Sequence, residues 1–173
     1  MIQQNELTIR RMTRNDFPLM VKWLNDPAVL EFFEEPPTDF ERVNQKYGPR
    51  VDGHHYVTPW IIEYRNQRIG YIQHYKIQEN ELITYGYDGK QIYGIDQFIG
   101  ETDYWGKGIG TKVIQLMLNY LCEKGAEKVV LEVKNNNNRA ISSYEKCGFQ
   151  RIKELHNNLS LMEWIPEVIN ISQ

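Results

Sequence analysis

A glycine-rich turn between an apolar segment and an amphipathic segment is the feature that most restricts how this chain can fold. The turn, residues 104–111, reads YWGKGIGT and follows an apolar, strand-like run at residues 93–99. Residues 112–122, which come next, have apolar side chains at the spacing of one helical face. A strand, a glycine-rich turn and a helix in this order point unpaired backbone N–H groups at an anion, and glycines let the anion approach the backbone. The turn therefore predicts a phosphate-binding loop, in which Lys107 adds positive charge.

Two familiar nucleotide-binding patterns do not fit this turn. A nucleotide P-loop needs a glycine, four residues and then Gly-Lys-Ser/Thr, but five residues separate Gly100 from Gly106, and Lys107 is followed by Gly108. The dinucleotide fingerprint Gly-x-Gly-x-x-Gly also fails, because Gly106, Gly108 and Gly110 are evenly spaced. Taken alone, the turn is equally compatible with a tight connection that binds no ligand.

A second segment, residues 137–149, narrows the interpretation. It follows a strand-like run at residues 128–133, and Asn137 is suited to begin a helix because its side chain can accept from a free backbone N–H. Gly148 is suited to end that helix, and Phe149 begins another strand-like run. One helical face carries the apolar or aromatic residues Ala140, Ile141, Tyr144 and Cys147.

Together the two segments resemble the GNAT superfamily of acyl-CoA-dependent N-acetyltransferases. In that superfamily the glycine-rich loop binds the pyrophosphate of coenzyme A, and the tyrosine of the second helix, here Tyr144, reaches the coenzyme sulfur. The resemblance implies acetyl-CoA as cofactor and an α/β fold of the GNAT type, with a central mixed, mostly antiparallel twisted sheet of about six or seven strands flanked by helices. The alternation of strand-like and helix-like segments also favours one α/β domain, which we expect to span residues 1–173.

Periodicity and turn residues divide the remaining chain into further elements. Residues 80–90 are polar and turn-rich, so we expect a loop there, and a hairpin turn is expected across residues 66–67. Additional helices are predicted at residues 17–24, 27–33 and 40–47. The predicted strands are residues 6–12, 57–64, 68–77, 93–99, 128–133, 149–155 and 159–165.

Four short stretches, YGPR at 47–50, VTPWI at 57–61, IGYIQ at 69–73 and YGIDQ at 93–97, resemble aminoglycoside 6′-N-acetyltransferases. This similarity runs from about residue 6 to residue 165. It implies transfer of an acetyl group from acetyl-CoA to the 6′-amine of an aminoglycoside antibiotic, by direct attack of the amine on the thioester, and hence antibiotic resistance.

The resemblance also implies roles for individual residues. Asp96 matches the carboxylate proposed as the base for the reacting amine, and Tyr144 matches the tyrosine placed to protonate the departing thiolate. Cofactor contacts are expected, besides Tyr144, from Phe98, Ile99, Gly100, Gly106, Lys107, Gly108, Ile109, Gly110, Thr111, Asn137 and Ala140. Acceptor contacts are expected from Glu34, Trp60, Gln73, Asp96 and Glu132, although core packing is the ordinary role for a tryptophan such as Trp60.

Two positions depart from the pattern of these relatives. Many have Gln or Arg where Trp105 stands, and the antibiotic-modifying enzymes carry an Asp-Pro pair where this chain has Glu132-Val133. The second departure leaves the acceptor open. The alternatives are a GNAT enzyme that acetylates another primary amine, such as a polyamine, a protein N-terminus or a siderophore precursor, and a non-catalytic acyl-CoA-binding module.

Composition limits the other partners. The net charge of −3 and the pI near 5.8 are atypical of a nucleic-acid-binding protein and suit a small cationic substrate. No apolar run is long enough to span a membrane, and the two cysteines and four histidines show no metal-ligand spacing. We therefore expect a cytoplasmic monomer or homodimer that binds no nucleic acid, no membrane and no metal.

Overall fold

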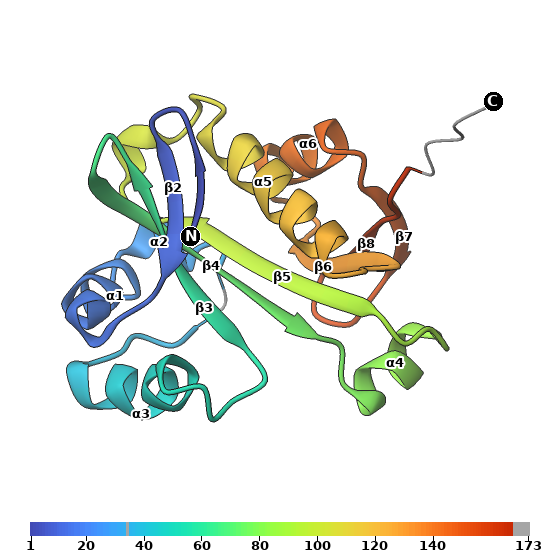
Figure 1. Ribbon diagram of the computed structural model, residues 1–173, viewed down its shortest axis with the longest axis horizontal. Coiled ribbons are helices and arrows are strands. Elements are labelled where there is room, and N and C mark those ends of the chain that lie inside the picture. The colour runs from blue at the N-terminus through green and yellow to red at the C-terminus, as the bar shows by residue number, and fades with distance from the viewer. Residues whose placement is uncertain (34, 168–173) are drawn as a thin grey trace.

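The computed structural model describes residues 1–33 and 35–167, and its centre is a single eight-stranded sheet (Figure 1). Every pair of neighbouring strands is antiparallel except β5 and β6, which run parallel. The mixed, mostly antiparallel sheet expected from the sequence is therefore confirmed, with eight strands instead of six or seven. In spatial order the strands are β1 (Ile2–Gln4), β2 (Leu7–Arg11), β3 (Thr58–Tyr64), β4 (Gln67–Lys76), β5 (Ile92–Ile99), β6 (Lys128–Lys134), β8 (Leu159–Trp164) and β7 (Gln150–Glu154).

Alternate strand residues point to opposite faces of this sheet, so both faces carry apolar side chains. Helices cover both faces and bury these side chains. On one face Ile61, Tyr71 and Phe98 pack in a core with α1 (Phe17–Trp23) and α3 (Phe40–Val51). On the other face a second core lies beneath α5, which crosses in front of the sheet in Figure 1. The remaining helices are α2 (Pro27–Leu30), α4 (Glu79–Tyr85), α5 (Ile109–Glu123), α6 (Asn138–Lys146) and the 3-10 turns η1 (Arg14–Asp16) and η2 (Thr102–Tyr104).

Two elements, α4 and β1, were not predicted, because each is too short for its sequence pattern to be recognised. The loop expected at residues 80–90 contains helix α4, whose Tyr85 packs in a small core with Ile77 and Ile92 and which ends at Gly86 with φ +79°. Strand β1 has only three residues, too few to show alternation, and it pairs with β2 at the edge of the sheet.

Two further boundaries move by a few residues. Helix α3 continues through Gly48 and Pro49 to Val51, although proline removes one helical hydrogen bond. Tyr47 and Gly48, at the start of this last turn, are buried and hold it against the rest of the protein. The hairpin turn between β3 and β4 consists of Arg65 and Asn66, both with positive φ, as two-residue hairpin turns require.

Strands β5 and β6 separate soon after they meet. Their pairing covers only Ile92–Gly94 and Lys128–Val130. Beyond these residues the carboxyl-terminal half of β5 stays paired with β4 and diverges from β6. The gap between the diverging strands opens the sheet at its middle.

No helix within residues 1–33 and 35–167 is long and apolar enough to cross a membrane.

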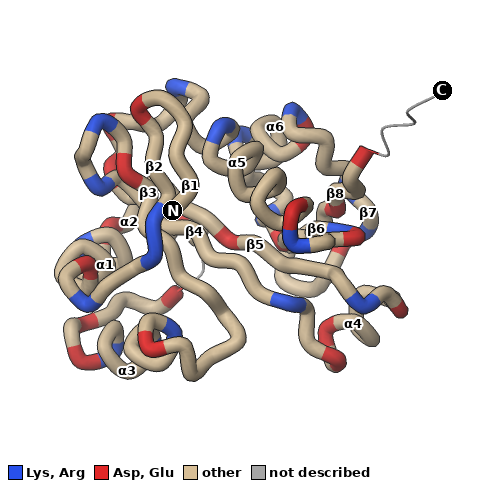
Figure 2. The backbone as a smooth tube through the Cα atoms, viewed as in Figure 1, with Lys and Arg blue, Asp and Glu red and all other residues tan. Residues whose placement is uncertain are grey.

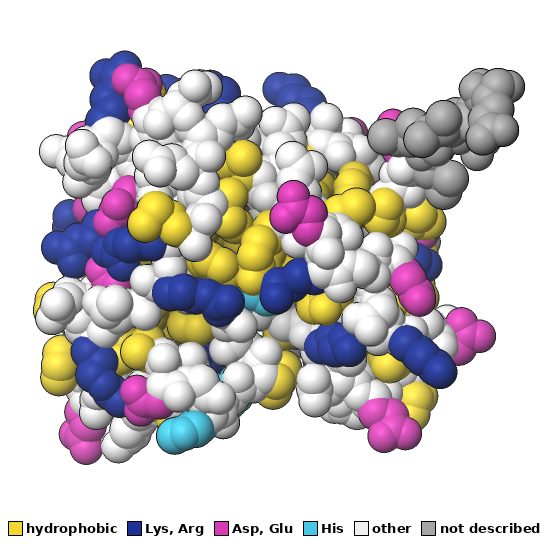
Figure 3. All heavy atoms as spheres, viewed as in Figure 1, with side chains coloured by type: hydrophobic (Ala, Val, Ile, Leu, Met, Phe, Trp, Pro, Cys, Tyr) yellow, Lys and Arg dark blue, Asp and Glu magenta, His cyan; other side chains and the backbone are white. Residues whose placement is uncertain are grey.

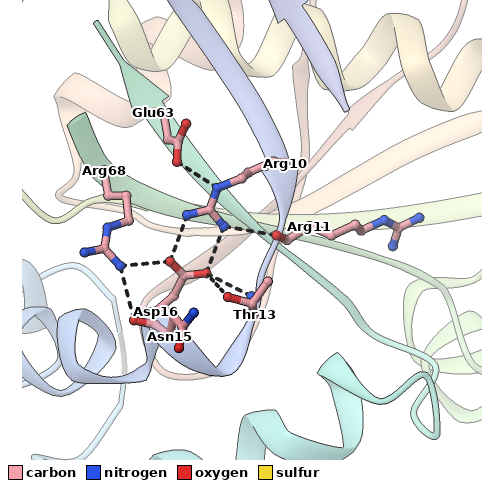
Figure 4. Close-up of polar contacts among 7 residues, drawn as sticks. All are labelled: Arg10, Arg11, Thr13, Asn15, Asp16, Glu63 and Arg68. Atoms are coloured by element: carbon pink, nitrogen blue, oxygen red, sulfur yellow. Dashed lines mark hydrogen bonds and ion pairs between the residues drawn. The ribbon is translucent and has the colours of Figure 1, made fainter. Parts of the chain in front are cut away.

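A buried carboxylate, Asp16, ties the first helix to the sheet (Figure 4). Arg10 of β2 donates to both of its oxygens at 2.9 Å, and Arg68 of β4 donates to Oδ1 at 3.1 Å. The backbone N–H of Thr13 donates to Oδ2 at 2.8 Å. Burial alone would raise the pKa of Asp16, but these hydrogen bonds outweigh it and lower the pKa below its usual value. A charged Asp16 is therefore matched by donors on every side.

We expect Asp16→Asn to lower the free energy of unfolding by about 2–3 kcal/mol, because the buried amide loses the charge that attracts Arg10 and Arg68 and cannot accept all the hydrogen bonds that Arg10, Arg68 and Thr13 donate to the carboxylate. Asp52→Asn is the matched control: Asp52 pairs with Arg14 at 2.7 Å, but the two side chains are 42% and 50% exposed, so the loss should stay below about 1 kcal/mol. Urea unfolding followed by circular dichroism measures both changes, and equal losses would contradict a special role for Asp16.

The effect of Asp16→Asn should also depend on pH. A carboxylate with a lowered folded-state pKa contributes stability above its unfolded pKa near 3.8 and loses it as the pH falls through the folded value. The difference between wild type and Asp16→Asn should therefore shrink as the pH drops below 3.8.

Candidate active site

A cavity of about 190 Å³ occupies the gap between β5 and β6. One wall is the end of β5 and the other is formed by Glu132 and Val133 of β6. The glycine-rich turn and the start of α5 close one end, α6 lines the side, and Val29, Phe32 and Phe33 form part of the rim. Among the residues expected to contact cofactor or substrate, the cavity is lined by Asp96, Phe98, Ile99, Gly106, Gly108, Ile109, Gly110, Thr111, Glu132, Asn137, Ala140 and Tyr144.

The glycine-rich turn presents the amino terminus of α5 to this cavity. Gly106 and Gly108 have φ +74° and +75°, and Gly108 is the residue at which the helix begins. No side chain of the described chain caps the first turn of α5. The first N–H groups of a helix have no partner within the helix, and the helix dipole makes this end positive. The turn is therefore suited to bind a phosphate or diphosphate.

Trp105 and Arg139 line the cavity together, and the sequence assigned neither of them a role there. The Trp105 indole donates to the carbonyl of Ile99 at 2.8 Å, and the Arg139 guanidinium lies 3.9 Å from the Trp105 ring centroid. An arginine in the first turn of a helix has the wrong sign for the helix dipole. That mismatch is the sequence signal that could have identified Arg139 as a functional residue.

Helix α6 begins at the cavity as expected. The side chain of Asn137 accepts from the backbone N–H of Ala140 at 3.2 Å. Tyr144, one turn later, is buried and packs edge-on against Phe149. Burial raises the pKa of Tyr144, and the nearby Asp96 and Cys147 raise it further. The phenol therefore stays protonated near neutral pH and is available as a proton donor.

Asp96 lies on β5 just after the strands separate, and it is half-buried in the cavity wall. Gln73 of β4 donates to its Oδ2 at 2.8 Å. Burial is the largest influence and raises the pKa of Asp96 above its usual value, while Gln73 and the Tyr75 hydroxyl oppose the rise. Tyr75 reaches this position because its ring crosses Gly94, where a Cβ atom would come within 2.5 Å of the ring. The result is a carboxylate that binds protons more readily than an exposed one.

Further acids surround Asp96. Glu132 of β6 accepts a hydrogen bond from the Tyr85 hydroxyl of α4, and its charge raises the pKa of Asp96. Glu81 of α4 also has a raised pKa, because of its burial first and then the charges of Glu132 and Asp96. Figure 2 shows acidic positions on β5 and on α4. Three separate elements thus carry acids whose charges affect one another, and two of these acids, Asp96 and Glu132, line the cavity.

The placement of Trp60 corrects its assignment to the acceptor site. Trp60 is 1% exposed and lies in the core beneath α5, where its indole donates to His74 at 2.9 Å. Arg11 lies over its ring and Tyr120 packs against it edge-on. This is the face seen in Figure 3, where apolar side chains gather beside Lys and Arg. The residue is therefore part of the protein core and is covered from solvent.

Four other assigned residues lie apart from the cavity lining or outside the described chain. Gly100 packs against the Trp23 ring, and its N–H is already bonded to the Ile69 carbonyl, so a cofactor contact through that N–H is excluded. Lys107 is exposed above the Tyr104 ring. Gln73 touches the cavity only through Asp96, and Glu34 lies outside the described residues.

No group of three or more His, Cys, Asp or Glu side chains suited to hold a metal ion occurs in the part of the chain that the structure describes.

Known proteins resemble this chain in sequence. A family model described as an acetyltransferase (GNAT) domain matches residues 12–157. Aminoglycoside N(6')-acetyltransferase type 1 of Klebsiella pneumoniae is 30% identical over 151 residues, which cover 85% of this chain and 75% of that protein. The match thus spans most of both chains.

Known structures resemble it as well. Aminoglycoside acetyltransferase AAC(6')-Ib, solved with coenzyme A and kanamycin, superposes with a TM-score of 0.75 at 29% identity and covers 92% of this chain and 94% of that chain. Spermidine N-acetyltransferase from Vibrio cholerae, solved with coenzyme A and spermine, gives a TM-score of 0.78 at 18% identity and covers 94% and 96% of the two chains. The second likeness shows the fold alone.

Proposed function

Because this chain belongs to the acetyltransferase (GNAT) domain family, which uses acetyl-CoA, we propose that it acetylates the 6′-amine of an aminoglycoside antibiotic. The relatives at 29–30% identity act on or bind aminoglycosides by name. The observation that carries the proposal is one cavity that joins a half-buried carboxylate, Asp96, to a protonated phenol, Tyr144, and to the amino terminus of α5.

The residues of the cavity fit coenzyme A. The backbone amides of the glycine-rich turn are free to hold the diphosphate, since no side chain of the described chain caps α5. The edge of β5 that diverges from β6, at Phe98 and Ile99, can pair with the amide-bearing arm of the coenzyme. When bound, the coenzyme supplies the acetyl group as a thioester, which an unprotonated amine can attack.

Asp96 prepares the acceptor amine. An ammonium group has no lone pair, so it must lose a proton before it can form a bond to carbon. The Asp96 carboxylate holds the cation by charge and then accepts that proton, and its raised pKa makes it a better base than an exposed aspartate. A protonated Tyr144 can give its proton to the sulfur that leaves. After the new C–N bond forms, the nitrogen still carries one surplus proton, and this proton restores the phenol of Tyr144.

The acids beside Asp96 support a polycationic acceptor. Glu132 and Glu81 lie on separate elements, so they can meet other amines of a substrate whose reacting amine sits at Asp96. A polyamine fits the same charges, and Glu132-Val133 in place of the relatives' Asp-Pro keeps this second candidate open. A non-catalytic module is disfavoured, because Asp96 and Tyr144 both line the cavity.

Replacing Gly108 should weaken coenzyme binding. At φ +75° an alanine is strained, and relief of the strain would turn the first amides of α5 away from the diphosphate. We expect the Kd for coenzyme A to rise about tenfold in Gly108→Ala, by isothermal titration calorimetry. Gly125→Ala is the control, because Gly125 has φ +88°, with open space around it, just beyond the other end of α5. An equal loss of affinity in both variants would show that general backbone strain lowers the affinity, and not the direction of the first amides of α5.

The acceptor itself can be identified directly. We expect release of free thiol from acetyl-CoA with kanamycin- or tobramycin-like aminoglycosides, and mass spectrometry and NMR should locate the new acetyl group on the 6′-nitrogen. Spermidine, spermine and a peptide with a free N-terminus serve as competing acceptors in the same assay. Faster turnover of a polyamine than of any aminoglycoside would replace the first candidate by the second.

Removing the base should stop turnover without affecting the coenzyme. We expect Asp96→Asn to lower kcat by about 10²- to 10⁴-fold, because the amide cannot accept the ammonium proton, while the Kd for coenzyme A stays unchanged. Asp88→Asn removes an equal charge from an exposed position near the end of α4 and should keep wild-type kcat. Wild-type turnover in Asp96→Asn would rule out this carboxylate as the base.

A further inference from the structure

A polar chain connects helix α3 to the Asp96 carboxylate, and the reaction outlined above gives it no part. Arg50 Nη1 donates to Gln73 Oε1 at 2.9 Å, and the Tyr71 hydroxyl donates to the same oxygen at 2.6 Å. The Gln73 amide nitrogen then donates to Asp96 Oδ2 at 2.8 Å. Two donors therefore converge on the amide oxygen, and the amide nitrogen faces the carboxylate.

Arg50 determines which way the Gln73 amide points. A guanidinium has donors and no acceptor, so the atom that faces it must be the amide oxygen. The reverse orientation would place the amide NH₂ against the guanidinium and the amide oxygen against the Asp96 carboxylate. Buried Tyr71 adds a second donor on the same side. Gln73 is thereby held as a donor to Asp96.

Attraction of the substrate does not explain the position of Arg50. A guanidinium repels an approaching ammonium. Arg50 also lies 5.3 Å from the Tyr47 ring centroid, and Tyr47 packs edge-on against Tyr71, so the side chain is held from two directions. Its Nε atom is buried without a hydrogen-bond partner among the residues that the structure describes, which is unfavourable for stability. The arrangement therefore calls for a role beyond packing.

We propose that Arg50, Tyr71 and Gln73 form a positioning network that holds Oδ2 of Asp96 and so sets the direction in which this carboxylate receives the proton of the acceptor amine. The proposal rests on the proposed acetyltransferase reaction at Asp96. In that step an N–H bond of the ammonium breaks, the proton forms a bond to a carboxylate oxygen of Asp96, and the electron pair stays on nitrogen for the attack on the thioester carbonyl. Because Oδ2 is fixed by Gln73, the direction of Oδ1 is fixed as well.

The charges around Asp96 give the network a measurable effect. Burial raises the pKa of Asp96 and so does Glu132 of β6, whereas Gln73, the Tyr75 hydroxyl and Arg50 lower it. Loss of Arg50 removes a cation and leaves the Gln73 amide held by the Tyr71 hydroxyl alone, and both changes favour protonated Asp96.

The groups around Asp96 on α4 and α6 keep their side chains in such a variant, whereas Tyr47 loses a direct neighbour. Glu81 and Tyr85 of α4, Tyr47 of α3 and Tyr144 of α6 each respond to the charge of Asp96. Glu81, Tyr85 and Tyr144 do not contact Arg50 in the described structure, so Arg50→Met changes Asp96 through Gln73, Tyr71, Tyr47 and the lost charge of Arg50 itself.

The test is a ¹³C NMR titration of protein labelled at the aspartate side-chain carboxyl carbon, with the Asp96 signal identified by its absence in Asp96→Asn. We expect the pKa of Asp96 to rise by about one unit in Arg50→Met. It should change little in Arg50→Lys, which keeps a cationic donor. Arg42→Met makes the same change at an exposed position of α3 and should leave the Asp96 signal at its wild-type pKa.

Kinetics and folding complete the test. In the pH profile of kcat/KM, the acidic limb should move to higher pH in Arg50→Met and in Gln73→Leu. Thermal unfolding of both variants is compared with that of the wild type to show that they are folded. An unchanged Asp96 pKa in a folded Arg50→Met would overturn the network. If the wild-type protein acetylates no amine, the proposed function fails, and the titration still decides whether Arg50 and Gln73 control Asp96.

Discussion

The limited pairing of β5 with β6 is the constraint on which the rest of the site depends. These strands are bonded only up to Gly94 and Val130, and the next residues of β5 diverge with one edge free of β6. The cavity fills this gap, and Asp96 lies two residues past the last bonded pair. A sheet paired along its full length would have no cavity in its middle and would bury Asp96 without access to a substrate.

The cavity is electrostatically divided, and the division matches the two molecules that an acetyltransferase brings together. At one end the amino terminus of α5 offers unpaired N–H groups and a positive dipole, suited to a diphosphate. At the other end Asp96, Glu132 and Glu81 supply negative charge, suited to an amine. Tyr144 also lines the cavity, with a phenol that burial keeps protonated. Attraction of a polyanion and a polycation to opposite ends brings their reacting atoms toward the middle.

Elements with strong, long patterns could be predicted from the sequence. Residues 93–99 and 112–122 lie within β5 and α5, because apolar alternation and helical spacing persist over enough residues to outweigh local exceptions. Helix α4 and strand β1 could not be predicted, because each is short and forms only where neighbouring elements offer a surface or an edge. The position of Trp60 could not be predicted either. The sequence around this tryptophan does not indicate on which face of β3 its side chain lies.

The sequence by itself determined the glycine-rich turn, the helix start at Asn137 and the residue types at Asp96 and Tyr144, because these depend on neighbours a few residues away. Only the tertiary structure decided that Gln73 lies opposite Asp96, that Arg50 orients the Gln73 amide and that Arg139 covers Trp105. Each of these contacts joins residues more than twenty positions apart, in the first two cases 23 positions. Strand register and helix packing set such contacts, and both result from burial summed over the whole sheet, which no local pattern contains.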